Sequence, residues 1–232
     1  MSRYVIGDVH GDYDTLVKLL YLIKVTKSDD VYFIGDLIDR GNKSADVVKL
    51  VRDINAKCVL GNHELMMIDS VVHNDSYIWL CNGGQVTLDS YNSDQQTIES
   101  DVEWMKRLPL LIDLDDYVLV HGGLEVDKPL DKQTDNVCWI REGFHNAPKY
   151  INRPVIIGHT ITGTMNNINP GYLAVTDKWI NIDTSCYWSK SGWLTALNLD
   201  DLTVYQVNAF TNATRIQPIE LLSNKYEHSY SR

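Results

Sequence analysis

The sequence predicts an α/β fold in which two mixed β-sheets pack face to face as a sandwich and helices cover the outside. Two observations predict it. Strand-like apolar runs alternate with helical patterns through the first sixty residues, which is typical of a parallel sheet. After residue 110, short strands joined by tight turns at Asp177-Lys178 and Asp200-Asp201 indicate antiparallel hairpins. Sheets of both kinds bury their apolar faces most readily as packed layers.

The first half of the chain is expected to alternate strand and helix. The three strands expected there cover residues 3–7, 31–35 and 57–60. Apolar residues at helical spacing predict a helix capped by Asp12 or Asp14 and a second helix capped by Asn42 or Ser44. Another helix is expected to begin near His63. Since ligands collect beyond the carboxyl ends of parallel strands, the residues that follow these strands should lie together.

The second half is expected to be mostly antiparallel sheet, after a polar and irregular stretch over residues 73–100. Within that region, Ser100 and Glu103 have capping-box spacing for a short helix through Trp104. A long loop is expected from about residue 121 to 153. The seven strands expected here cover residues 110–115, 117–121, 154–158, 172–176, 179–182, 193–199 and 203–208.

Composition indicates an ordinary globular protein. The 232 residues are 44% hydrophobic and 22% charged, and we predict one domain over residues 1–232 with residues 223–232 as a flexible tail. The formal net charge of −10 argues against a nucleic-acid partner, which would require a basic face. No apolar run is long enough to span a membrane, and no cysteines form a C-x-x-C pair. We therefore expect a cytoplasmic protein with no membrane partner.

Five strand-like runs each end in a glycine beside an Asp, Asn or His. The five motifs are Gly7-Asp8-Val9-His10-Gly11, Gly35-Asp36-Leu37-Ile38-Asp39-Arg40-Gly41, Gly61-Asn62-His63-Glu64, His121-Gly122-Gly123 and Gly158-His159. One such motif would be read as a turn, but five together indicate a site. Carboxylate, imidazole and amide groups bind hard or borderline divalent metals. The candidate ligands are Asp8, His10, Asp36, Asn62, His121 and His159.

The same motifs predict phosphoryl chemistry. Asp36 has two carboxylate oxygens with which it could bridge two ions. Two ions about 3.5–4 Å apart would clamp the attacking and leaving oxygens of a phosphoryl displacement. Arg40 adds a planar donor fork that suits phosphate oxygens. His63, oriented by Asp39, is the candidate general acid for the leaving group.

The motifs, in this order over roughly residues 4–160, resemble those of the phosphoprotein phosphatase family of calcineurin-like metallophosphatases. Trp139-Ile140-Arg141-Glu142 resembles the segment that carries the second phosphate-binding arginine of that family. Ile182-Asp183-Thr184 and the compact size point to its bacterial and bacteriophage branch. Five motifs in order are far more specific than any one of them.

The resemblance implies a role for each matching residue. Asp8, His10 and bridging Asp36 would hold a first metal ion, and Asp36, Asn62, His121 and His159 would hold a second. Asp39 and His63 would form the acid pair, and Arg40 and Arg141 would hold the phosphate. Two divalent ions are implied; manganese is expected, although iron, zinc or nickel would accept the same ligands.

Two enzymatic functions compete. The favoured prediction is a metal-dependent serine/threonine protein phosphatase, able also to accept phosphotyrosine, in which a metal-bound hydroxide attacks the phosphomonoester directly. The alternative is hydrolysis of diadenosine tetraphosphate or a related nucleotide. Leu60 favours the alternative, because many family members have arginine there whereas bacterial diadenosine tetraphosphate hydrolases have leucine. Asp39 favours the phosphatase, because those hydrolases typically lack it. We weigh the acid pair above Leu60, since it bears on the chemical step.

A non-catalytic module that binds phosphoproteins is a third possibility, and the presence of every proposed ligand argues against it. The partners expected are phosphorylated proteins or peptides, and the sequence does not indicate an oligomeric state. Glu64 is expected to act only through the helix dipole. Asp183 either supports the site or ends a strand. The tryptophans expected to serve in core or rim packing are Trp79, Trp104, Trp179, Trp188 and Trp193.

Overall fold

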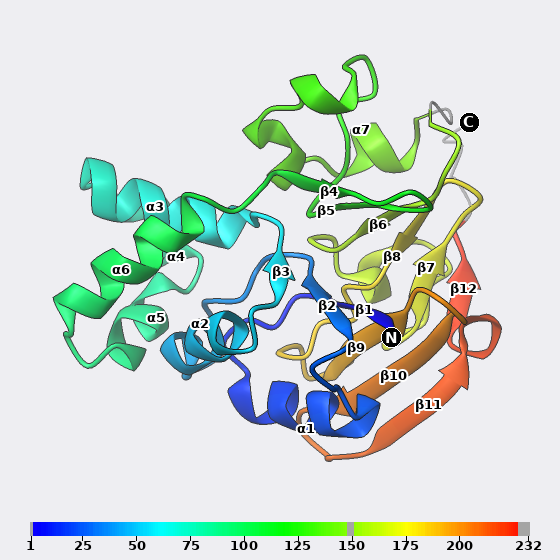
Figure 1. Cartoon of the computed structure of the whole chain (residues 1–232), viewed down its shortest axis with the longest axis horizontal. Coiled ribbons are helices and arrows are strands. Elements are labelled where there is room, and N and C mark those ends of the chain that lie inside the picture. The colour runs from blue at the N-terminus through cyan, green and yellow to red at the C-terminus, as the bar shows by residue number, and fades with distance from the viewer. Residues whose placement is uncertain (1, 148–150, 227–232) are drawn as a thin grey trace.

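Two sheets face each other in the computed structural model, which describes residues 2–147 and 151–226 (Figure 1). The first sheet has the strand order β11-β10-β9-β1-β2-β3, and the second has the order β12-β7-β8-β6-β5-β4. Both sheets contain parallel and antiparallel pairs. The predicted sandwich of two mixed sheets is therefore confirmed.

The elements of the described chain have the following bounds. The strands of the first sheet are β1 (Arg3–Ile6), β2 (Asp30–Phe33), β3 (Lys57–Cys58), β9 (Trp193–Asn198), β10 (Thr203–Asn208) and β11 (Thr214–Pro218). Those of the second sheet are β4 (Leu111–Asp113), β5 (Val118–Val120), β6 (Val155–Ile157), β7 (Leu173–Val175), β8 (Trp179–Asn181) and β12 (Ser223–Lys225). The α-helices are α1 (Tyr13–Ile23), α2 (Ser44–Asp53), α3 (Asn62–His73), α4 (Tyr77–Cys81), α5 (Gly84–Ser90), α6 (Gln95–Met105) and α7 (Glu142–His145). Short 3-10 turns cover Leu130–Lys132, Asp135–Cys138, Thr162–Thr164 and Ile219–Leu221.

Apolar layers on both faces of the first sheet hold these elements together. Between the sheets, alternate residues of both sheets meet in one buried cluster that includes Val5, Leu119 and Ile156. The other face of the first sheet packs against the long helices through residues such as Leu16 and Val47. Figure 1 shows α1 and α2 beside the first sheet and α7 beside the second. The site at the strand ends is therefore carried by two rigid sheets.

The pairing of strands differs in part from the prediction. The hairpins at Asp177-Lys178 and Asp200-Asp201 are present, because β7 pairs antiparallel with β8 and β9 with β10. However, β5–β6, β6–β8 and β7–β12 are parallel, so antiparallel pairs prevail in the second half, as expected, without being the only kind. The long connection from β5 to β6 explains the first of these parallel pairs, because it is long enough to return the chain in the same direction.

Several local expectations are wrong. Residues 73–100, expected to be irregular, contain α4, α5 and the start of α6. The α6 helix begins after Asp94, whose side chain accepts a hydrogen bond from the Thr97 N–H, so Ser100 lies within the helix and does not cap it. Part of the expected tail is also ordered: β12 pairs with β7, while residues 227–232 lie outside the described residues.

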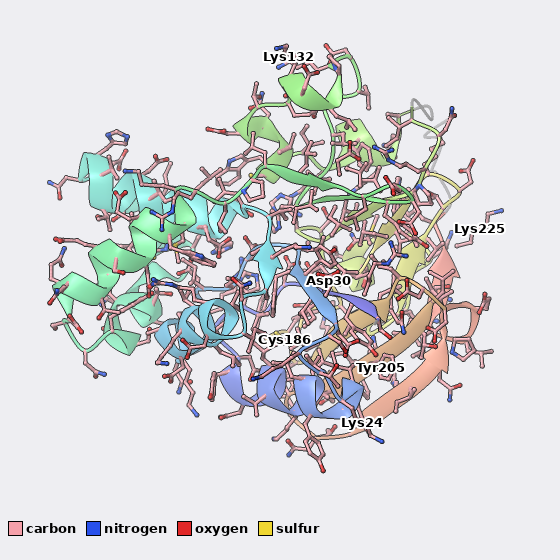
Figure 2. All side chains as sticks on the ribbon, in the orientation of Figure 1. Lys24, Asp30, Lys132, Cys186, Tyr205 and Lys225 are labelled. Atoms are coloured by element: carbon pink, nitrogen blue, oxygen red, sulfur yellow. The ribbon has the colours of Figure 1, made fainter. Side chains whose placement is uncertain are left out.

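The structure also shows the state of the cysteines and the character of the helices. Cys58, Cys81, Cys138 and Cys186 are unpaired, and all four lie in the described part of the chain. Cys186, labelled in Figure 2, is buried, and its Sγ–H donates to the Val9 carbonyl at 3.1 Å. Within residues 2–147 and 151–226, no helix combines the length and the apolar character needed to cross a membrane.

Candidate active site

The six candidate metal ligands lie just beyond the carboxyl ends of strands from both sheets. Asp8 and His10 follow β1, Asp36 follows β2, Asn62 follows β3, His121 follows β5 and His159 follows β6. All six residues are buried, with at most 7% of their surface exposed. The structure thus brings together every ligand that the sequence predicted.

An unusual backbone conformation aims these side chains. His10, Asp36, Asp39, Arg40 and His159 have φ angles of 48°, 52°, 71°, 68° and 63°, in the left-handed region that non-glycine residues seldom adopt. Such conformations persist where the surrounding structure imposes them, and they cluster at functional sites.

Two motif glycines allow the strand ends to approach one another closely. A Cβ on Gly158 would lie 2.1 Å from Asp8 Oδ1, and a Cβ on Gly35 would lie 2.7 Å from Gly61 Cα. Side chains at these two positions would push the neighbouring strand ends apart, which explains the glycines that precede His159 and Asp36.

Asp36 is the centre of the cluster. Its Oδ1 lies 3.2 Å from His121 Nε2, and its Oδ2 lies 3.6 Å from His10 Nε2. Asp36 belongs to two groups of side chains, and within each group the metal-ligating atoms lie within 4.8 Å of one another. One group also contains His10 and His63, and the other also contains His121 and His159. A carboxylate common to both groups has the geometry that a bridging ligand requires.

Two buried ligand atoms have no hydrogen-bond partner. These are Asp8 Oδ1 and His159 Nε2, whereas the other oxygen of Asp8 accepts from the His159 N–H at 3.0 Å. Burial and the neighbouring Asp183 carboxylate raise the pKa of Asp8 well above its ordinary value. Unpartnered buried polar atoms are destabilising, and a cation would satisfy both of these. The donor set therefore fits divalent metal ions.

Each candidate histidine ligand is oriented by a second hydrogen bond. The Nδ1–H groups of His10 and His121 donate to the carbonyls of Ile38 and Ile34 at 2.9 and 2.7 Å, which leaves Nε2 for an ion. Burial lowers the pKa of His10 to about 3 and that of His159 to about 2, so both rings are neutral, as metal ligation requires. Burial acts in the same direction on His121, but the Asp36 carboxylate outweighs it and raises that pKa to about 10, so a bound cation would have to displace the proton of this ring. Asn62 adds its Oδ1, 3.0 Å from His121 Nε2.

Asp39 and His63 form the pair that the sequence predicted. Asp39 Oδ2 lies 2.5 Å from His63 Nδ1, and Asp39 also accepts from Trp79 Nε1 at 3.0 Å and Thr87 Oγ1 at 2.7 Å. Burial works against the charged form of His63, but the carboxylates of Asp36 and Asp39 outweigh it and raise the pKa. The ring is therefore fixed in place and favours the protonated state that a general acid needs.

The two predicted phosphate-binding arginines line one cavity of about 310 Å³. Arg40 donates to the hydroxyl of Tyr187, and its guanidinium carbon lies 4.3 Å from the centre of the Tyr187 ring. Arg141 donates through Nη1 to the His159 carbonyl at 2.8 Å and to Thr160 Oγ1 at 3.0 Å. Guanidinium groups from distant parts of the sequence thus face the metal-binding groups.

Some residues of the site have roles that the sequence did not predict. Trp79 is core packing as expected, but its indole N–H also orients Asp39. Tyr187 belongs to no motif, and only the fold brings its ring beneath Arg40. Glu64 does more than interact with a helix dipole: it is fully buried and accepts from the backbone N–H groups of Asp36, Leu37 and Gly61. Asp183, left open from the sequence, lines the cavity.

Comparison with known proteins assigns a family. Residues 1–184 match the calcineurin-like phosphoesterase family, so the chain belongs to it. This confirms the resemblance inferred from the motifs. The chain is thus a metallophosphoesterase, and the family implies divalent metal ions, in agreement with the cluster around Asp36.

Several curated proteins are similar in sequence. The symmetrical bis(5'-nucleosyl)-tetraphosphatase of Pasteurella multocida is 30% identical over 168 residues, which cover 66% of this chain and 58% of that protein. The protein of the same name from Nitrosospira multiformis is 25% identical over 270 residues, covering 89% and 95%. Serine/threonine-protein phosphatase 2 of Escherichia coli is 32% identical over 124 residues, covering 51% and 57%. In the first and third cases the chain spans little more than half of its relative.

Solved structures agree on the fold. A candidate diadenosine tetraphosphatase has a TM-score of 0.70 at 20% identity, covering 90% of this chain and 94% of its own. A protein serine/threonine phosphatase from Saccharomyces cerevisiae has a TM-score of 0.57 at 16% identity, covering 94% and 80%. At these identities the likeness shows the fold alone.

The prediction of a protein phosphatase is wrong. Most of the strongest sequence matches carry the name symmetrical bis(5'-nucleosyl)-tetraphosphatase, which favours the alternative. The error came from weighing the acid pair above Leu60. A proton donor can assist any phosphate leaving group, so Asp39 and His63 do not select a substrate. Leu60 is 6% exposed and packs in the core, outside the cavity lining, so it contributes no phosphate contact.

Proposed function

We propose that this calcineurin-like phosphoesterase hydrolyses dinucleoside polyphosphates and cleaves diadenosine tetraphosphate symmetrically into two molecules of adenosine diphosphate. The observation that carries the proposal is the shared name of the sequence relatives, one of which aligns over 89% of this chain and 95% of its own length.

The electrostatics of the cavity support this substrate class. The chain has a formal net charge of −10, so a polyanion needs local positive charge to bind. Arg40 and Arg141 supply it from the cavity wall, and bound cations would add to it. Arginine forks pair with phosphate oxygens in a bidentate manner, which suits a chain of phosphates.

Two divalent ions are proposed, with manganese as the first to test. Asp8, His10 and Asp36 would hold one ion, and Asp36, Asn62, His121 and His159 would hold the other. When bound, the ions would act as Lewis acids toward the phosphoryl oxygens of the substrate.

The chain also has four unpaired cysteines, which support the proposal of a cytoplasmic setting.

The chain's own residues account for the remaining steps. Arg40 and Arg141 would bind and orient the phosphates. His63 would transfer a proton from Nε2 to the departing phosphate oxygen, while Asp39 holds Nδ1 and fixes the ring. A nucleoside diphosphate is a much better leaving group than a serine alkoxide. The proton donor should therefore contribute less to this reaction than to phosphomonoester hydrolysis.

The test is the purified chain with diadenosine tetraphosphate and a series of divalent ions, with products separated by anion-exchange chromatography. Symmetrical cleavage yields adenosine diphosphate alone, whereas asymmetrical cleavage yields adenosine monophosphate and triphosphate. The Asp36→Asn variant, purified identically, controls for contaminating hydrolases. A higher kcat/KM for a phosphoserine peptide than for the dinucleotide would overturn the proposal.

A further inference from the structure

One aromatic side chain on the cavity wall is exposed without an evident structural role. Trp139 is 45% exposed, whereas Trp79, Trp179 and Trp193 are buried and Trp104 and Trp188 are partly buried. All six tryptophans lie within the described residues. A large indole is normally withdrawn from water, and it dominates recognition where it is exposed in a pocket.

The position of Trp139 ties it to the reaction centre. Its ring centre lies 6.5 Å from that of His159, with the planes at 85°, and it lines the same cavity as Arg40 and Arg141. The backbone of Trp139 also makes a hydrogen bond with the His159 side chain. A group resting on the indole would therefore lie one side chain away from the proposed metal ligands, with Arg141 two residues along the chain.

The backbone around Trp139 is held firmly. Its N–H donates to the Asn136 carbonyl at 2.9 Å, and the next residue, Ile140, donates to the same carbonyl at 3.1 Å. The preceding Cys138 is fully buried, and its Sγ–H donates to the Leu60 carbonyl at 3.1 Å. The indole is thus an exposed face on an anchored backbone, which binds a flat ligand with little loss of conformational entropy.

We propose that Trp139 is a stacking platform for one nucleobase of the substrate, an inference that rests on the proposed function. A phosphate near Asp36 would be joined through further phosphates and a ribose to a base over the indole, and Arg141 would contact the connecting phosphates. Tyr187, which also lines the cavity, already carries the Arg40 guanidinium on one face. Stacking depends on a π face and not on base-edge contacts, so Trp139 selects for a base without reading its identity.

The experiment compares the binding of two ligands that differ in the nucleoside. Calorimetry with the metal-loaded protein measures the affinity for adenosine diphosphate and for inorganic pyrophosphate. In the native chain, adenosine diphosphate should bind more tightly, by roughly tenfold for one stacked base. Trp139→Ala should remove this difference and leave pyrophosphate binding unchanged, whereas Trp139→Phe should retain most of it. Tyr21→Ala, which removes an aromatic ring that is 85% exposed on α1 and not in the cavity lining, is the matched control.

The outcomes separate this inference from the proposed function. If adenosine diphosphate and pyrophosphate bind alike in the native chain, or if Trp139→Ala keeps their difference, the stacking role is overturned. Turnover of diadenosine tetraphosphate by the native chain is measured separately. If the dinucleotide is hydrolysed but its KM is unchanged in Trp139→Ala, only the stacking role fails. If it is not hydrolysed at all, the proposed function fails, and with it the role of Trp139 in substrate recognition.

Discussion

The two sheets contribute unequally to the site. The first-sheet side carries Asp36, Asp39 and His63, and each of these is fixed by several hydrogen bonds to buried groups. The second-sheet side carries Arg141 and Trp139 on the long connection between β5 and β6, and both side chains are exposed. The acid pair and the shared carboxylate thus lie in a buried, hydrogen-bonded region, whereas Arg141 and Trp139 are presented to the cavity from a loop. Functional loops on rigid scaffolds commonly divide the work in this way.

The largest effect should come from the residue common to both metal groups. Asp36→Asn keeps the size of the side chain but removes its charge, so both ions should bind more weakly, each by more than about 100-fold, the upper range for residues that only support a ligand. Elemental analysis after dialysis should show both ions lost and activity abolished. His10→Ala should reduce mainly one ion. Two tightly held ions and full activity in Asp36→Asn would exclude a bridging role.

The next largest effect concerns His63 on the same side. His63→Asn should retain the metal content and slow hydrolysis of an alkyl phosphomonoester by about 10²–10⁴-fold. Hydrolysis of diadenosine tetraphosphate should slow much less, because its leaving group scarcely needs a proton. Stopped assays with both substrates at one metal concentration provide the comparison. Loss of an ion would instead make His63 a ligand, as its grouping with His10 and Asp36 allows.

The difference between the two sides also explains what the sequence could predict. The candidate ligands on both sheets were predictable, because each follows an apolar strand and has a glycine neighbour. Trp79, Thr87 and Tyr187 were not, because they come from segments without a periodic pattern and reach Asp39 or Arg40 only through tertiary contacts. The substrate was mispredicted from the acid pair on the buried side, which can assist leaving groups of either kind.

The accuracy of the predicted strands also depends on how apolar each strand is. Strand β12 is short and polar, and it pairs with β7, which lies fifty residues earlier in the sequence, so residues 223–225 looked like a tail. In contrast, β1 and β2 are mostly apolar, and their bounds were predicted to within two residues. Local sequence patterns report burial, and they fail where backbone hydrogen bonding alone defines an element.

A smaller effect, on stability, should come from Glu64. Its carboxylate accepts from three backbone N–H groups, at Asp36, Leu37 and Gly61, and so joins the second and third motifs. Glu64→Gln leaves one of its two acceptor oxygens and should destabilise the fold by about 1–3 kcal/mol. Urea unfolding of the metal-free protein measures this without a contribution from ion binding. The control is Glu103→Gln, an exposed residue that pairs with Lys106 and should have almost no effect.

The smallest effect is expected where the two sides of the site meet, at Tyr187. Its ring lies beneath the Arg40 guanidinium and edge-on to His10, and its hydroxyl accepts from Arg40. Tyr187→Phe keeps the ring contact and removes only the hydroxyl, so Arg40 should lose part of its orientation and KM for diadenosine tetraphosphate should rise by about threefold to tenfold. Tyr187→Ala also removes the ring contact and should raise KM further. The rate kcat should change little in Tyr187→Phe, because Asp39, His63 and the metal-binding groups remain in place.

A fall in kcat with KM unchanged would show that Arg40 acts mainly on the transition state and does not merely bind the ground-state phosphate. Arg40 would then belong functionally with the catalytic residues of the first-sheet side. Binding of the ground-state substrate would depend on the second-sheet side alone.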